Sequence, residues 1–421
     1  MIKKKKALSL ISAIALFIIS IVFPVGFFSG CSSSYELYLF NPYRYIDFST
    51  VGRFKADLHV HTNNSDGLSS PDATVERFAN LGFDFLAIAD HDYWMYGRFA
   101  NNAPLHTGLR SWPNNRDYTI TYPWERFGVI DRRGVTPIQS SELSRLHHMN
   151  TFFTCFVESR TAITEVELLN QALVHSERQA RFMLNHPQRH INQAMRAGGL
   201  MPQTQANRNL WLSNTDTNAV KTALWYQNLL RAVPEILAFE VFNQNDRYYG
   251  DRLHYDIIMR GLMPNRPVWL AANSDNHGDH YGQSVNVMLL QENTLDAFKE
   301  AFDRGAFFAK SFGNFNPEIL EVNGAIGDRW KFLPTINDIV VDNNSGDIII
   351  KADTYTYIEW ITEGGIVVAT GNSINFRTNR YIKNYVRAVL KNIAVDGTVI
   401  ATTLMQPFGV GRFNPNSLFF R

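Results

Sequence analysis

Short apolar runs that end in a histidine or a carboxylate recur along this chain of 421 residues. The first is "RFKADLHVH", residues 53–61, in which apolar and polar residues alternate as in a strand with one buried face. Successive side chains of a strand point to opposite sides, so we expect His59 and His61 to project in the same direction. Two imidazoles placed in this way can converge on one metal ion. Histidines also have structural uses, so other segments of the chain are needed to show whether this pair binds a metal.

The same ending recurs in later strand candidates, which alternate with helical patterns over residues 51–311. One helix is predicted from Ser70 as the N-terminal cap and Pro71 as the first helical residue to a stop at Gly82. The alternation predicts an α/β architecture, and in parallel barrels the active site forms at the C-terminal ends of the strands. The residues at such ends are His59, His61, His91, Glu142, His186, Asp275 and His277.

The texture of the chain changes after residue 312. Valine and isoleucine alternate with polar residues over residues 313–421, and "NNSGD" and "EGG" have the composition of hairpin turns. We therefore expect a small all-β sandwich domain at 313–421, after an α/β domain at 51–312 and a tether at 32–50.

The N-terminal segment, residues 1–31, has the layout of an export signal. Four lysines, Lys3 to Lys6, precede a long apolar run, and Ser29-Gly30-Cys31 resembles a bacterial lipobox whose cysteine is lipidated. An uncleaved membrane anchor is the alternative, since the run is long enough to cross a bilayer. Both interpretations predict an extracytoplasmic protein attached to the cell membrane.

The charge balance argues against a nucleic-acid partner. The formal charge of the whole chain is +1, and the four lysines at positions 3–6 are the only charged residues before Cys31, so a chain starting at Cys31 would carry −3. No basic field is left to hold a phosphate backbone. We expect no nucleic-acid binding.

Nine histidines and carboxylates in five segments form a candidate metal-binding set. Imidazole nitrogens and carboxylate oxygens are ligands that Zn, Mn and Fe accept together. Nine donors, with a glutamate able to bridge two ions, are enough for about three divalent ions. The set is His59, His61, Asp66, His91, Glu142, His148, His186, Asp275 and His277.

The order of these motifs resembles the PHP (polymerase and histidinol phosphatase) superfamily of metallohydrolases over residues 52–311. "DLHVHTNNSDG", "AIADHD", "SSELSRLHHMN", "LNHP" and "NSDNHG" carry the resemblance. "DHD", "HHMN" and "NSDNHG" before a β-rich tail look most like its CehA/McbA-like branch. The resemblance implies a distorted (β/α)7 TIM-like barrel with three metals, followed here by the small all-β sandwich domain.

The resemblance also implies how the ligands divide among the metals. The first metal would take His59, His61, Glu142 and Asp275. The second would share Glu142 and add His148 and His186. The third would take Asp66, His91 and His277. His148 is preferred over His147 because the superfamily has a histidine followed one residue later by an asparagine, here Asn150.

Other polar residues receive weaker assignments. Arg145, between two ligands, is the first candidate to hold a substrate phosphate, or else forms a salt bridge at the barrel rim. Further cation candidates are Arg98, Arg189 and Lys310. Three aspartates flank the candidate ligands: Asp57, Asp90 and Asp92. Each either orients an imidazole through the ring nitrogen that does not bind the metal or is an ordinary carboxylate at the end of a strand. Glu240 is expected to form a structural salt bridge.

The expected activity is hydrolysis of a small-molecule phosphoester or ester. Metals held this way make hydroxide available at neutral pH, and a hydroxide bridging the two metals that share Glu142 would face the substrate. The resemblance implies a phosphoesterase first, with carbamate or carboxylester hydrolysis on the same site as the alternative. A non-catalytic surface binding lipoprotein is the alternative from another class.

Overall fold

The structure, a computed structural model, describes residues 36–92, 134–144, 147–154, 156–157, 164–190, 217–313 and 326–413. Within these ranges, no helix is both long enough and apolar enough to cross a bilayer. The predicted export signal and the first part of the tether, up to residue 35, lie outside them.

A five-stranded sheet in the order β5-β6-β7-β8-β9 forms one side of the α/β part. Pairing is antiparallel from β5 to β7 and parallel from β7 to β9. The strands are β5 (Ser140–Ser144), β6 (His148–Phe152), β7 (Arg181–Leu184), β8 (Ile236–Asn243) and β9 (Trp269–Asn273).

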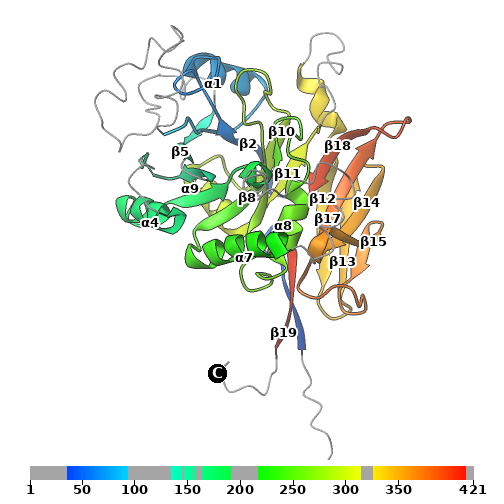
Figure 1. Ribbon diagram of the computed structural model, residues 1–421. Coiled ribbons are helices and arrows are strands. Elements are labelled where there is room, and N and C mark those ends of the chain that lie inside the picture. Colours follow the sequence, from blue (N-terminus) through cyan, green and yellow to red (C-terminus); the bar gives the residue numbers. More distant parts are fainter. Residues whose placement is uncertain are drawn as a thin grey trace, which may run out of the picture. The chain divides into compact units, whose positions relative to one another are not determined.

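An eleven-stranded sheet forms the other side and continues into the C-terminal region (Figure 1). Its main path is β1-β19-β17-β18-β11-β10-β2-β3-β4, and β14 and β15 extend it from β17. Its strands are β1 (Glu36–Phe40), β2 (Gly52–Val60), β3 (Phe85–Ile88), β4 (Thr136–Ile138), β10 (Ser284–Leu290), β11 (Phe307–Ser311), β14 (Tyr357–Thr362), β15 (Ile366–Thr370), β17 (Tyr385–Ile393), β18 (Val399–Leu404) and β19 (Phe408–Phe413).

The two sheets enclose one apolar core, but hydrogen-bonded pairing does not close them into a barrel among the described residues. Side chains of both sheets, such as Leu58 from β2 and Met183 from β7, meet in this core. At the two seams only single parallel bridges form, Val60 with Asn276 and His91 with Glu142. The predicted α/β class is confirmed. The closed ring of a (β/α)7 barrel is not seen, because the strands at these seams give way to loops that carry the candidate ligands.

Five α-helices of the described chain cover the sheets. Each buries an apolar face, and α4, α7 and α8 share a core cluster with the five-stranded sheet. The helix expected after Ser70 forms as α1, with the Ser70 hydroxyl accepting the backbone N–H of Ala73. The helices are α1 (Pro71–Asn80), α4 (Glu165–His175), α7 (Thr217–Ala232), α8 (Asp251–Met259) and α9 (Leu295–Arg304), with 3-10 turns η4 (Ile326–Phe332) and η5 (Glu363–Gly365).

The C-terminal strands stack in two layers around a second apolar core. A three-stranded sheet, β12 (Thr335–Asp342), β13 (Asp347–Asp353) and β16 (Ser373–Asn375), contributes Ile348 and Ile350. The facing layer contributes Trp360 from β14 and Leu390 from β17. These strands are not detached from the α/β part, since β11 pairs directly with β18. The division of the chain at residue 312 stays a prediction.

Lys310 lies at this junction rather than at the candidate site. It is buried on β11, and its ammonium group donates a 2.8 Å hydrogen bond to the carbonyl of Pro334. Burial, together with the charge of Arg53, lowers the pKa of Lys310 to about 7. The prediction that Lys310 binds a substrate phosphate is therefore wrong. The side chain is committed to a backbone carbonyl between the two parts of the chain.

Replacing Lys310 by methionine tests this burial. Between the folded pKa of about 7 and the unfolded value of about 10.4, only the unfolded chain holds the extra proton, so wild-type stability rises with pH. We expect Lys310→Met to be more stable than wild type at pH 7, with the advantage shrinking by up to roughly 1.4 kcal/mol per pH unit above it. Urea unfolding of both proteins at pH 7, 8 and 9 measures this difference, and parallel curves would contradict it.

Candidate metal centre

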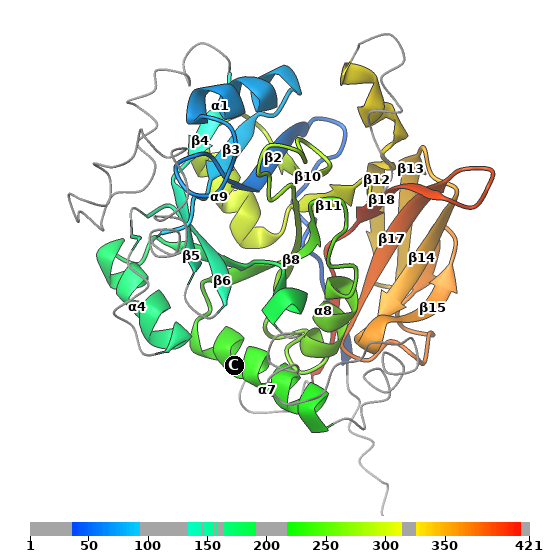
Figure 2. The same cartoon turned by 45° about the horizontal axis from the view of Figure 1, so that its top comes forward.

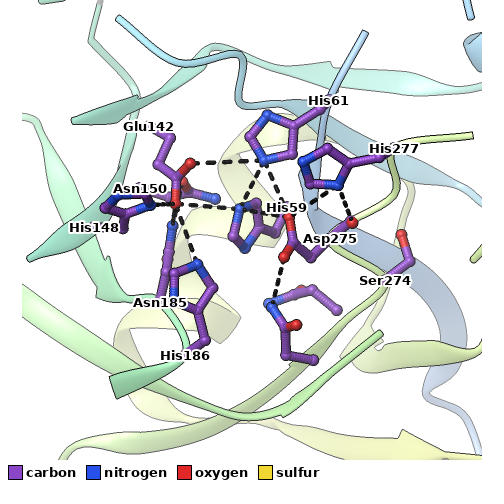
Figure 3. A network of polar contacts seen from close by, with 12 residues as sticks. His59, His61, Glu142, His148, Asn150, Asn185, His186, Ser274, Asp275 and His277 are labelled. Atoms are coloured by element: carbon purple, nitrogen blue, oxygen red, sulfur yellow. Dashed lines mark hydrogen bonds and ion pairs between the residues drawn. The ribbon is translucent and has the colours of Figure 1, made fainter. Parts of the chain in front are cut away.

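All nine candidate ligands come together on one side of the shared core, and Figure 3 shows the part around Glu142 and Asp275. His59 is the penultimate residue of β2, Glu142 is the middle residue of β5, and His148 begins β6. The others follow strand ends: His61 and Asp66 after β2, His91 after β3, His186 after β7, and Asp275 and His277 after β9. Four overlapping groups have donor atoms within 4.8 Å of one another.

His59 and His61 form the centre of the cluster. Their Nε2 atoms lie 3.1 Å apart, so both rings point at the same space. Asp275 Oδ1 lies 3.3 Å from the first nitrogen and 3.1 Å from the second. Glu142 Oε1 lies 3.4 Å from His59 Nε2, and its Oε2 lies 3.6 Å from His61 Nε2. These are the four residues that the resemblance assigned to the first metal.

Glu142 links this centre to further histidines. Its Oε1 lies 3.0 Å from His148 Nδ1 and 3.6 Å from His186 Nε2, whereas its Oε2 lies 2.8 Å from His91 Nδ1. A glutamate with different neighbours at each oxygen is suited to bridge two ions. The donor groups differ in part from the expected division, because His186 also groups with His59 and Asp275, and His148 with His91.

Asp66 gathers a third group nearer the surface. Its Oδ2 lies 3.4 Å from His91 Nε2 and 3.2 Å from His277 Nε2, and its Oδ1 lies 3.6 Å from His61 Nδ1. The side chains of Asp66 and His277 are 23% and 30% exposed, whereas His61 is 1% exposed. This group is therefore the part of the cluster that solvent and a small molecule reach.

The electrostatics keep the central acids ionised. Burial alone would raise the pKa of Glu142, but the charges of His148, His91 and His59 lower it well below its ordinary value. Asp275 is likewise buried, and His59 and His61 hold its pKa well below its ordinary range. Ionised, water-shielded carboxylates need nearby positive charge.

The donor set fits divalent metal ions. In the described part of the chain, every ion-pair partner of Glu142 and Asp275 is a histidine, and no lysine or arginine neutralises them. Imidazole nitrogens and carboxylate oxygens that converge in a buried space form a coordination environment for Zn, Mn or Fe. The residues present therefore match the metal that the sequence led us to expect.

Glu240, on β8, supports the cluster from behind, and its ion pair with His59 agrees with the expected structural salt bridge. Its Oε1 lies 3.0 Å from His59 Nδ1, the nitrogen that faces away from the other donors. Its Oε2 accepts the backbone N–H of His186 at 2.9 Å. Such a carboxylate fixes the orientation of a metal-binding imidazole. The signal in the sequence was only that Glu240 sits near the end of a strand.

The three aspartates expected behind the imidazoles act on other groups. Asp57 accepts the backbone N–H groups of His59 and Ser274. Asp90 accepts the hydroxyl of Ser65 and the backbone N–H and hydroxyl of Thr62, and Asp92 accepts the backbone N–H of Ser144. These contacts hold the loops that carry the ligands and fit the strand-end alternative.

His148, rather than His147, faces Glu142. His147 stacks on Trp225 with ring centroids 4.3 Å apart, and its Nδ1 lies 3.1 Å from the hydroxyl of Tyr226. His190 was missed as a neighbour of the cluster: its Nε2 accepts the backbone N–H of His148 at 3.1 Å. His190 reaches the site through the short helical turn that follows His186. It does not stand at the end of a strand, so the pattern that identified the other histidines does not include it.

Two candidate ligands have an unusual backbone. His186 has φ of 30° and Asp275 has φ of 42°, a left-handed region that residues other than glycine rarely adopt. Such conformations cluster at functional sites, where the surrounding structure holds them. Here they turn the chain sharply out of β7 and β9, which directs both side chains into the cluster.

The described residues include some of the arginines that could bind an anionic substrate. Arg145 and Arg98 lie outside the described residues. Arg189 is half-buried, and its backbone N–H donates to the carbonyl of His186. The guanidinium of the exposed Arg247 lies 5.5 Å from the ring centroid of Tyr248. The ring of Tyr248 lies 5.5 Å from that of His186, so this pair of arginines lies on the His186 side of the cluster.

Comparison with known proteins finds only distant likenesses. No family model matches the chain, and no curated protein matches its sequence. It is similar to a two-domain protein from Bacteroides vulgatus that contains a predicted PHP-like metal-dependent phosphoesterase, with 15% identity, a TM-score of 0.43, and coverage of 86% of this chain and 96% of that one.

Two further solved structures match the chain over 59% of its length and 96% of their own. An amidohydrolase from Chromobacterium violaceum has 13% identity and a TM-score of 0.28. A proposed metal-dependent phosphoesterase from Bifidobacterium adolescentis has 18% identity and a TM-score of 0.29. TM-scores below 0.5 carry no argument about this chain, so its function has to be inferred from the site itself.

Glu240→Gln tests the support behind His59. In one orientation the amide NH2 group of the glutamine faces His59 Nδ1. In the other orientation it faces the backbone N–H of His186. We expect Zn or Mn affinity to fall about 10- to 100-fold, the usual cost of losing such a partner, with the fold retained. Metal competition titrations, with circular dichroism as the folding check, measure this. Unchanged affinity would show that Glu240 does not orient the ligand.

Proposed function

We propose that this chain is a metal-dependent hydrolase of the PHP type that cleaves a small-molecule phosphoester. The observation that carries the proposal is the convergence of nine imidazole and carboxylate side chains from separate segments around Glu142. The finer assignment to the CehA/McbA-like branch, with a distorted seven-stranded barrel, rests on the motif order in the sequence.

We propose three divalent ions, held in overlapping groups. His59, His61, Glu142 and Asp275 would hold the first, and Glu142 with His148 and His186 the second. Asp66, His91 and His277 would hold the third. Bound divalent ions supply Lewis acidity and lower the pKa of water toward ~7, which makes a nucleophile available at neutral pH.

The residues of the chain prepare the site for this chemistry. Glu142 and Asp275 stay ionised, and Glu240 holds the His59 ring with Nε2 turned toward the other donors. Asn185 donates to Glu142 Oε1 at 2.8 Å and keeps that carboxylate in place. The partly exposed Asp66 and His277 face the side from which a substrate enters.

A phosphoester suits this site better than a neutral substrate. Two arginines, Arg189 and Arg247, lie on the His186 side of the cluster, where they can attract and orient an anion. Carbamate or carboxylester hydrolysis uses the same donors and is the alternative within this class.

His59→Ala tests the proposal. Removing an imidazole that shares the central space should lower the bound metal from about three ions per chain and abolish hydrolysis. Metal content by plasma mass spectrometry and hydrolysis of bis-p-nitrophenyl phosphate, p-nitrophenyl phosphate and a naphthyl carbamate provide the two measurements. His175→Ala, on the exposed end of α4, is the matched control that should keep both.

The outcomes separate the candidate functions. Turnover of a phosphate ester that His59→Ala loses supports the phosphoesterase. Turnover of the carbamate alone favours the alternative hydrolase. Wild-type protein that binds no metal after incubation with Zn or Mn contradicts the enzyme and supports the non-catalytic binding lipoprotein.

We also propose that the protein is extracytoplasmic and attached to the membrane through its N-terminal segment. The support is the order of lysines, apolar run and Ser29-Gly30-Cys31 in the sequence. A hydrolase in that place would meet small-molecule substrates from outside the cytoplasm, and no nucleic-acid partner is proposed.

Cys31→Ser separates lipid attachment from an uncleaved anchor. If Cys31 carries the lipid, the variant should lose incorporation of labelled palmitate and keep an unprocessed N-terminus, because serine offers no thiol to acylate. Membrane fractionation with mass measurement of the intact chain gives the result. Identical processing of variant and wild type would favour the uncleaved anchor.

A further inference from the structure

The sheet formed by β14, β17 and β18 has two different faces. Along β14, Ile358 and Trp360 enter the apolar core, so the intervening Glu359 and the following Ile361 face the other side. Along β17, Ala388 and Leu390 enter the core, so Arg387 and Val389 face the other side too. Charged side chains therefore line the face that does not pack within the β layers.

That face borders a cavity rather than open solvent. Helix α8 and the loop after β8 lie opposite it (Figure 2), and Arg387 from the sheet contacts Asp256 on α8. The cavity has a volume of about 550 Å³, within the range of small-ligand pockets of about 300–1,000 Å³. None of the nine candidate metal ligands lines it.

Three ion pairs line the cavity and balance one another. Arg387 and Asp256 form a buried two-bond pair at 2.9 and 2.6 Å. Arg252 and Asp246 form a second two-bond pair at 2.6 and 2.9 Å, and Lys391 and Glu359 a third at 2.8 Å. The side chains of the latter two pairs are 15–26% exposed, so a ligand can reach them.

We propose that this cavity binds a neutral, polyhydroxylated ligand such as a sugar unit. A strongly charged ligand would have to break one of the existing pairs and leave its partner uncompensated. A neutral hydroxyl can instead donate to a free carboxylate lone pair and accept from a free guanidinium or ammonium hydrogen. The balanced charge of the lining is therefore matched by hydroxyl groups.

The apolar part of the lining suits the same ligand. Tyr249 and Val399 are exposed at the cavity, while Ile361 and Val389 lie on the strands between the charged groups. Aliphatic and aromatic side chains bury the C–H faces of a sugar ring while polar groups fix its orientation. This site is independent of the proposed hydrolase activity.

Saturation-transfer NMR of the full chain tests the proposal. The probes are glucose, galactose, N-acetylglucosamine, maltose and cellobiose, with glutamate and lysine as charged comparisons. We expect at least one neutral saccharide to bind. Val399→Trp fills the cavity from its exposed edge without touching an ion pair and should abolish that signal. Val395→Trp, fully exposed before the same strand, is the matched control that should keep it.

Glu359→Gln provides a second test that does not depend on cavity filling. It removes the charge but keeps an acceptor oxygen, and should weaken saccharide binding while leaving metal content unchanged. Binding of no saccharide in the panel overturns the proposal. So does binding of the charged probes alone, or a saccharide signal that survives Val399→Trp. Loss of hydrolysis in His59→Ala with saccharide binding retained would separate the two sites.

Discussion

Burial of ionised carboxylates is the constraint on which the rest of this structure depends. Glu142 and Asp275 are both almost completely shielded from water. Withdrawing such groups from water costs several kcal/mol each unless charge and hydrogen bonds compensate. Here imidazoles and amide side chains supply the compensation. A bound cation at this place would further offset the free-energy cost of burying these carboxylates, which a chain without one would have to bear.

Strand periodicity made the centre of the site predictable. His59 and His61 do point the same way, as the alternation along residues 53–61 indicates. The alternation failed in one respect, because Asp57 and His59 are as buried as Ala56 and Leu58. A polar strand face normally meets water, but this one meets other polar side chains. Only the three-dimensional packing shows that.

Long-range pairing limits what the sequence can reveal. Glu240 lies 181 residues from His59, and nothing near it in the chain marks it as the partner of that ring. The same limit applies to the sheets. Local patterns predicted the strands and the α/β class, but not that β5 and β6 form an antiparallel pair or that β11 pairs with β18. Those contacts depend on segments that meet only after folding.

The alternation of side chains along β14 and β17 places apolar residues in the C-terminal core and charged residues on the opposite face of the same strands. The aliphatic neighbours of Trp360 in the core should tolerate volume-conserving apolar substitutions, whereas Trp360 itself also donates its indole N–H to the carbonyl of Gly371. The opposite face has no such freedom. Once Arg387 is buried against Asp256 it must stay paired, since an isolated charge there would be more costly than an apolar residue. That buried pair fixes α8 against the sheet and holds open the space between them.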